Sequence, residues 1–360
     1  MSNNLKDYIV LTPEQRQRLQ STYQRYRLLY QDPANSSPMI TVAVIDHTQD
    51  IAPPTWEQML ADPLVMLKSQ LDSIKSRLRI NDDSCPIVRI DFGTAQIPAA
   101  FGCELGFPEN SLPAAKNHSL HDIKDVHKLQ KPPLDAGWFG KLDQWTDIWL
   151  ANLPDGIIIQ HPDIQSAFNS ALLIRGSEFL TDLYDDPQSC FALMDLVTDF
   201  MIDITTHMRK AITSDPHWFF DWSGLWKGRA RISNCSMHLI SSQFYHQHVL
   251  PHDKRFIDAM GGGRIHYCGT QSQVLQHFYT IPGLTGLDID IAHHDLYDIC
   301  QQMPEHIPLL INPPPDSQLM ERLLDGDWPK KRNIIIGTWA YSPEQGDDLL
   351  ARLRDVTSRL

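Results

Sequence analysis

The sequence predicts an α/β fold, a (β/α)8 TIM barrel with an N-terminal helical extension and long loops at the barrel mouth. Short apolar runs of strand length alternate with longer segments whose apolar residues fall on one helical face. The alternation continues over about 320 residues, and eight strand-like runs suit one barrel better than two smaller units. An open doubly wound sheet is the alternative.

Residues 1–37 are predicted to be a helix and a linker. Thr12 followed by Pro13 is typical of a helix start, with threonine as the N-cap and proline at the first helical position. The helix is expected to run to about Tyr30, and the segment 32–38, with prolines at both ends, is a loop. Residues 38–360 are then predicted to form the barrel as one domain.

The predicted strands are short runs rich in isoleucine, valine and leucine, such as Ile334, Ile335 and Ile336. Strands of a parallel barrel are buried on both faces, so they are apolar in sequence rather than alternating. The eight runs lie at residues 40–46, 87–92, 157–160, 231–238, 264–268, 286–289, 308–311 and 333–337.

The segments between most of these strands have apolar residues at helical spacing. One amphipathic helix is predicted at residues 56–79, where the stripe consists of Met59, Leu60, Leu64, Met66, Leu67, Leu71 and Ile74. Further helices are predicted at residues 165–174, 187–208, 241–260, 272–280, 295–302, 315–324 and 343–360.

Two long connections interrupt this alternation. Residues 100–155 are rich in proline and glycine and follow the second strand, on the catalytic side of a barrel. Residues 217–228 contain five aromatic side chains and precede the fourth strand. Long aromatic loops above the mouth would enclose a large, partly apolar pocket. The alternative is that these aromatic residues seal the barrel rim or form a dimer contact.

The composition excludes several classes of function. The net charge of −13, from 31 basic and 44 acidic side chains, does not suit a protein that follows a phosphate backbone, so no nucleic-acid partner is expected. No apolar run approaches the roughly 18–20 residues that cross a bilayer, and the first residues have no signal-like pattern. Six scattered cysteines without CxxC spacing fit a reducing compartment. We therefore expect a cytoplasmic protein with no membrane partner.

The segment Gly263-Arg264-Ile265-His266-Tyr267-Cys268-Gly269 carries the strongest local signal. His266 and Cys268 lie two residues apart on a predicted strand, so their side chains point to the same face. They come at its carboxyl end, where a barrel has its catalytic groups. Imidazole and thiolate are donors that zinc prefers. The alternative is a buried histidine and cysteine in a packed barrel.

Other polar residues at strand ends are candidate substrate contacts. Gln160 and His161 end the third strand, and Asp288 ends the sixth. Asn234 and Ser236 share one face of the fourth strand. Trp339, after the eighth strand, is a candidate pocket wall. Core packing is the alternative for the two residues of the fourth strand.

Several segments resemble proteins of the uroporphyrinogen decarboxylase superfamily. Met237-His238-Leu239-Ile240-Ser241 through Val249-Leu250-Pro251, followed by His266-Tyr267-Cys268-Gly269, is similar to the central part of these proteins. Leu310-Ile311-Asn312-Pro313 resembles their seventh-strand Asn-x-Asp-Pro. The resemblance spans roughly residues 50 to 360 and implies the same (β/α)8 barrel.

Within this superfamily, His-x-Cys-Gly is similar to the zinc site of methylcobalamin:thiol methyltransferases. The resemblance implies a small-molecule thiol substrate, zinc, and a corrinoid supplied by a partner protein. It gives His266 and Cys268 as two metal ligands. The third ligand of that family is a cysteine just after the eighth strand, where this chain has Gly337-Thr338-Trp339-Ala340-Tyr341. Glu344 is a candidate oxygen donor in its place, and His238 is another candidate.

Two other functions stay open. The first is a decarboxylating lyase acting on a porphyrin-like or smaller acid. Asp91, at the end of the second strand, is similar to the catalytic aspartate of the decarboxylases, although their arginine-rich opening segment is missing. The second is a non-catalytic barrel that binds a corrinoid or a metal. By analogy with the superfamily, we expect a homodimer.

Overall fold

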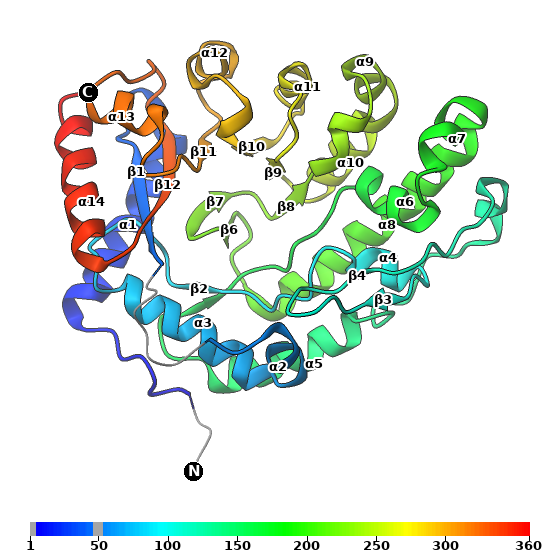
Figure 1. Cartoon of the computed structure of the whole chain (residues 1–360), viewed down its shortest axis with the longest axis horizontal. Helices are drawn as coiled ribbons and strands as arrows, with labels where there is room; N and C mark the ends of the chain where they lie inside the picture. The colour runs from blue at the N-terminus through cyan, green and yellow to red at the C-terminus, as the bar shows by residue number, and fades with distance from the viewer. Residues whose placement is uncertain (1–4, 46–52) are drawn as a thin grey trace.

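The structure is a computed structural model, and it describes residues 5–45 and 53–360. Among these residues, eight parallel strands stand in a ring with helices outside it (Figure 1). The strands of the ring are β1 (Met39–Val44), β2 (Ile87–Val88), β5 (Ile158–Ile159), β8 (Ala230–Ser233), β9 (Gly263–Tyr267), β10 (Leu284–Ile289), β11 (Leu309–Ile311) and β12 (Ile334–Ala340).

Backbone hydrogen bonds connect these strands around the ring. Six of them pair in the order β1-β12-β11-β10-β9-β8, and β2 pairs with β5. The amide of Ser166, just after β5, donates to the carbonyl of Ser233 at the end of β8. The amide of Asp83, just before β2, donates to the carbonyl of Ile40 in β1. The architecture is therefore the predicted (β/α)8 barrel.

The helices follow the strands along the chain and cover the outside of the ring (Figure 1). They are α1 (Pro13–Gln31), α2 (Trp56–Ala61), α3 (Pro63–Arg77), α4 (Gln96–Ala100), α5 (Phe139–Asn152), α6 (Ala167–Arg175), α7 (Phe179–Asp185), α8 (Pro187–Ile212), α9 (Ser242–Phe244), α10 (Leu250–Ala259), α11 (Ser272–Phe278), α12 (Leu296–Gln302), α13 (Gln318–Leu324) and α14 (Pro343–Thr357). In the described part of the chain, no helix combines the length and apolar character needed to span a bilayer.

All eight predicted strands are present, because their apolar residues are buried on both faces. Ile334, Ile335 and Ile336 of β12, for example, are at most 2% exposed. Several predicted boundaries differ; the second strand, for example, ends at Val88 rather than at residue 92. The predicted end of the first strand at Asp46 lies outside the described residues. The fourth strand ends at Ser233 rather than at residue 238, because the chain continues as a 3-10 helix (Cys235–Leu239).

The helix predictions need two corrections. Residues 56–79 form two helices, since Asp62 accepts a hydrogen bond from the Leu64 amide and caps a second helix that begins at Pro63. The connection 100–155 contains α5, whose buried face includes Phe139, Trp145 and Trp149. Between residues 100 and 139 the chain also forms the short pair β3 (Leu105–Gly106) and β4 (Ala114–Ala115).

The prediction that the aromatic connection 217–228 is a loop above the barrel mouth is wrong. It forms a hairpin of β6 (Trp218–Asp221) and β7 (Gly224–Lys227) in the middle of the ring (Figure 1). Phe219, Leu225 and Trp226 pack with inward-facing residues of β1, β11 and β12 and with Tyr26 of α1. The hairpin precedes β8, so it enters the barrel from the amino-terminal end and seals it there. This agrees with the alternative prediction that the aromatic residues seal one rim of the barrel.

Candidate functional site

Three side chains that could hold a metal ion lie together at the carboxyl end of β8 and β9. They are Cys235, His266 and Cys268, and one donor atom from each lies within 4.8 Å of the other two. In a tetrahedral zinc site the donor atoms stand roughly 3.5–3.8 Å apart, given bonds of about 2.3 Å to sulfur and 2.0–2.1 Å to nitrogen. The three side chains therefore need only small movements to fit one zinc ion.

The register of the two strands explains why Cys235 joins the predicted pair. Ser233 of β8 lies opposite His266 of β9. The amide of Asn234 donates to the carbonyl of His266 at 2.8 Å, which extends the pairing by one residue. Cys235 begins the 3-10 helix that follows β8, and from there its sulfur lies close to His266 and Cys268. Cys235 was not among the predicted site residues, because its place depends on the register between β8 and β9 and on where β8 ends.

Asp288 on β10 orients the imidazole of His266. Its Oδ2 lies 2.7 Å from Nδ1 of His266, so Nε2 is the nitrogen left for a metal. Burial alone would lower the pKa of His266, but the Asp288 carboxylate and a hydrogen bond with Cys268 raise it to about 9. A carboxylate behind a histidine ligand is the arrangement that fixes such ligands in metal sites. Asp288 therefore fixes the orientation of this imidazole, and its predicted contact with substrate stays a prediction.

Cys235 and Cys268 share one proton. The hydrogen bond from Cys235, together with the one from His266, lowers the pKa of Cys268 to about 5. The same hydrogen bond to Cys268, together with burial, raises the pKa of Cys235. Cys268 is thus a thiolate at neutral pH while Cys235 keeps its proton. A thiolate is the form of cysteine that binds a metal.

Buried ion pairs fill the barrel below the cluster. Arg264 is fully buried and contacts Asp288 at 3.2 Å and, through Nε, Asp221 of the hairpin at 2.6 Å. Arg231 binds Asp163 at 2.8 Å and lies 3.6 Å from Asp221. Each of these guanidinium groups already faces two carboxylates, so the pairs connect the hairpin rigidly to the strands that carry the cluster.

The hairpin tip brings an aromatic ring close to His266. The indole of Trp222 lies parallel to the imidazole, with ring centroids 6.3 Å apart and an angle of 15° between the planes. Its amide donates to Oε1 of Gln160 at 3.1 Å. A cavity of about 170 Å³ begins beside this indole, and it is lined by Gln70, Ile87, Arg89, Gln160, Trp222 and Ser223.

The two residues predicted at the end of β5 point in different directions. Gln160 faces the barrel interior and lines the cavity beside Trp222. His161 lies in a separate space between β5, the end of α8 and the hairpin, where its ring centroid is 6.5 Å from that of Phe219. Burial and the charges of Arg209 and Arg229 lower the pKa of His161 to about 3. His161 is therefore outside the cluster, because successive residues of a strand alternate in direction.

Asn234 and Ser236 do not face a pocket together as predicted. The Asn234 side chain donates to Asp253 of α10 at 2.6 Å and is fully buried between strand and helix. The Ser236 amide donates to Asn169 of α6 at 3.1 Å. Both contacts are with helices outside the barrel. The strand has ended at Ser233, and in the 3-10 helix that follows, side chains no longer alternate between the two faces of a sheet.

Asp91 lies three residues beyond the end of the second strand at Val88, rather than at the strand end as predicted, and it is in an ion pair. Its carboxylate accepts from Arg89 at 2.5 Å and from the amide of Gly93 at 3.1 Å. Among the described residues, no hydrogen bond or ion pair connects Asp91 with the cysteines and the histidine of the cluster. The paired carboxylate fits a structural contact of the strand end better than a free acid or base.

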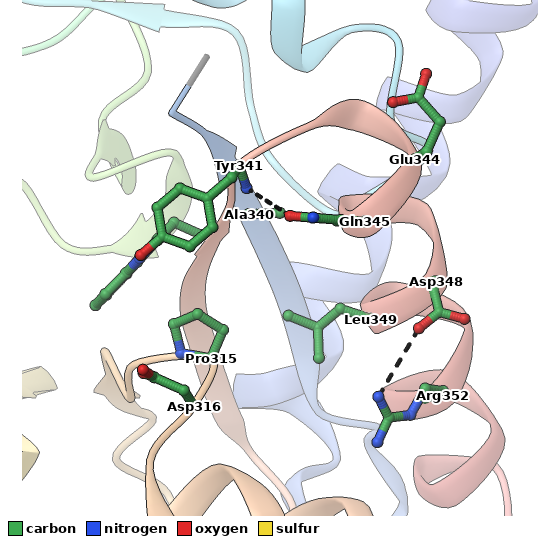
Figure 2. A pocket seen from close by; sticks show the side chains of 10 residues that line it. Pro315, Asp316, Ala340, Tyr341, Glu344, Gln345, Asp348, Leu349 and Arg352 are labelled. Carbon is green, nitrogen blue, oxygen red and sulfur yellow. Dashed lines mark hydrogen bonds and ion pairs between the residues drawn. The ribbon is translucent and has the colours of Figure 1, made fainter. Parts of the chain in front are cut away.

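Trp339 and Glu344 line another pocket, about 550 Å³ in volume (Figure 2), although Trp339 lies within β12 rather than after the eighth strand as predicted. Trp339 lines it with Pro315, Tyr341 and Leu349. Glu344 is also at this pocket, on the first turn of α14, and its carboxylate is directed away from Tyr341 and Pro315 in Figure 2.

Glu344 therefore does not complete the metal-binding group, although the sequence analysis offered it as the third donor. It lies 4.0 Å from Arg79 and is largely exposed. His238, the other candidate, hydrogen-bonds through Nδ1 to the carbonyl of Cys235 and is exposed. In the part of the chain that the structure describes, Cys235 takes this third position.

Comparison with known proteins places these features in a family. Residues 38–308 match the family described as uroporphyrinogen decarboxylase (URO-D). The chain is 24% identical to the methylcobamide:CoM methyltransferase MtbA of Methanosarcina acetivorans over 211 residues, and 25% identical to that of Methanosarcina mazei over 196 residues.

These alignments cover 56% and 52% of this chain, and 57% and 53% of the two relatives, so the chain matches little more than half of their length. The similarity of the fold covers more of the chain than the similarity of the sequence. A solved structure, a methyltransferase from Methanosarcina mazei, superposes with a TM-score of 0.67 over 94% of this chain and 98% of that one, at 15% identity.

Proposed function

The chain belongs to the uroporphyrinogen decarboxylase family, and on that premise we propose that it is a methyltransferase that moves a methyl group between a corrinoid and a thiol at a zinc site. One observation carries the proposal: Cys235, His266 and Cys268 have donor atoms within 4.8 Å of one another at the carboxyl end of the barrel. The names of the two relatives support the reaction class.

The donor set has the chemistry of a catalytic zinc site. Two sulfurs and one imidazole nitrogen suit zinc, and three protein ligands leave a fourth tetrahedral position for a substrate. Zinc at this position would lower the pKa of a bound thiol and present it as a thiolate. The family pattern has its third ligand, a cysteine, after the eighth strand. In this chain Cys235, just after the fourth barrel strand, would replace it.

The two cysteines, His266 and Asp288 would have different roles in binding zinc. With Cys268 as a thiolate, zinc binding would have to displace the proton of Cys235 and the second ring proton of His266. Asp288 holds the imidazole of His266 with Nε2 toward the two sulfurs. The corrinoid is expected to come with a partner protein, and a homodimer stays a prediction that light scattering at about twice 41.2 kDa would check.

The contacts of the arginines argue against the lyase. A polycarboxylate substrate needs guanidinium groups that are free to bind it. Arg89, Arg231 and Arg264 each form an ion pair with an aspartate of the barrel. We therefore expect no decarboxylation of uroporphyrinogen, and direct detection of coproporphyrinogen with purified protein would contradict this.

Metal analysis of protein purified without a histidine tag tests the proposal. We expect zinc to bind the wild type, and the variants Cys235→Ser, His266→Ala and Cys268→Ser to lose it. Cys300→Ser is the matched control, because Cys300 is a free, partly buried cysteine on α12 that is not in the group. Transfer of the methyl group from methylcobalamin to 2-mercaptoethanol should follow the zinc content. Wild-type protein that binds no added zinc at neutral pH would end the proposal.

A further inference from the structure

Trp222, at the hairpin tip, has a backbone conformation that a bulky residue does not favour. Asp221 pairs with Gly224, which leaves Trp222 and Ser223 as a two-residue turn with φ of +46° and +61°. Turns with positive φ at both positions prefer asparagine and glycine, because side chains with a Cβ are strained there. A bulky indole in this conformation indicates a role other than closing the turn.

Trp222 also differs from the other large side chains of the hairpin in its surroundings. Phe219, Leu225 and Trp226 are at most 2% exposed and belong to the core under the barrel. Trp222 is 45% exposed, although it lies inside the ring of strands. Its ring stands parallel to His266 and 5.8 Å from the guanidinium of Arg231. The exposed part of the indole therefore faces open space beside the metal-binding group.

The cavity beside Trp222 is small. Its volume is about 170 Å³. Trp222 borders both this cavity and His266, so the indole stands between the cluster and the strands β2 and β5. A ligand tail that extends from the cluster toward this cavity therefore meets the indole.

We propose that Trp222 sets the length of the thiol that can bind at Cys235, His266 and Cys268. This inference rests on the proposed function and names the residue that determines its substrate specificity. The hydrogen bond from the Trp222 amide to Gln160 and the ion pairs of the neighbouring Asp221 hold the tip at a fixed depth. The tail of a bound thiol would then contact the indole, and the indole would limit its length.

The variant Trp222→Asn separates this role from a structural one. Asparagine tolerates the left-handed conformation, so the hairpin should be as stable as in the wild type or more stable. A tryptophan that only stabilised the fold would give the opposite result, a lower melting temperature. Trp222→Phe, which keeps a ring, is the intermediate variant, and Trp218→Phe in the same hairpin is the matched control.

Calorimetric titration of the zinc-loaded proteins with ω-hydroxyalkanethiols of two to six carbons tests the proposal. In the wild type and in Trp218→Phe, the affinity should stop rising, or fall, once added carbons meet the indole. In Trp222→Asn it should keep rising, by up to about fourfold for each methylene group that becomes buried. The zinc content and the melting temperature of each variant are measured in parallel.

The outcomes distinguish the two proposals. If thiols bind but the length dependence of Trp222→Asn coincides with that of the wild type, Trp222 does not set the limit. The same holds if Trp222→Asn loses its zinc or melts well below the wild type, because the tryptophan is then structural. If zinc-loaded wild type binds no thiol of the series, the proposed function itself fails and this inference with it.

Discussion

Replacing Asp253 with asparagine should change the pH dependence of stability. Asp253 lies on α10 and is 1% exposed. Burial raises the pKa of Asp253 to about 7, against hydrogen bonds from Tyr245 and Asn234 that lower it. Among the described residues, Oδ1 of Asp253 and Oδ1 of Asn234 are both buried without a hydrogen-bond partner. A proton on Asp253 would provide a donor between these two acceptors.

The sign and the magnitude follow from the two pKa values of this group. In the unfolded chain an aspartate has a pKa of about 3.9, so between about pH 4 and pH 7 the folded protein holds a proton that the unfolded protein has lost. Stability therefore falls as pH rises through this range. At 1.36 kcal/mol for each pKa unit, the total loss is about 4 kcal/mol, and about 2.5 kcal/mol of it falls between pH 5 and pH 8.

Asp253→Asn has the shape of the protonated acid and cannot lose a proton. Its amide can accept from Tyr245 or Asn234 and also donate to Oδ1 of Asn234. Urea unfolding at several pH values should show the variant gaining about 2.5 kcal/mol on the wild type between pH 5 and pH 8. Asp258→Asn, an exposed position of the same helix, is the control. A constant difference between Asp253→Asn and the wild type over this range would refute the reasoning.

Two further predictions concern the ion pairs around the cluster. Asp288→Asn should weaken zinc binding by about 10–100-fold, because His266 loses the carboxylate that orients it. Competition with a chelator measures this, with the partly exposed neighbour Asp290→Asn as control, and an unchanged affinity would contradict it. Asp221→Ala should destabilise the protein by about 3–5 kcal/mol, since it leaves Arg264 and Arg231 buried with one carboxylate fewer. Urea unfolding measures this loss, and a value below about 1 kcal/mol would show that the other aspartates compensate.

Much of the barrel could be predicted from the sequence because its strands are buried on both faces. Runs such as Ile334, Ile335 and Ile336 are typical of strands that are covered on both sides. The hairpin could not be recognised in the same way. Its turn, Trp222-Ser223, lacks the asparagine or glycine that signals a hairpin, and its aromatic residues fit a loop as well as a strand.

The site was predicted in part for a similar reason. The two-residue spacing of His266 and Cys268 on one strand is a local pattern, so the sequence contains it. The third donor depends on the register between β8 and β9 and on the end of β8 at Ser233, and both are set by contacts across the barrel. Glu344 was chosen from its place in the sequence, and α14 turns it toward Arg79.

The hairpin inside the barrel also has a consequence for folding. Residues 218–227 contact β9, β10, β11 and β12, all of which come later in the chain, and they contact β1 and α1, which come earlier. The ring cannot close completely until the hairpin is in position, since a closed ring would have to open to admit it. During synthesis the hairpin leaves the ribosome before these later strands, so the order of the chain lets them assemble around it. A circular permutant that begins at β8 would place the hairpin after the strands that enclose it, and it should refold more slowly than the natural chain.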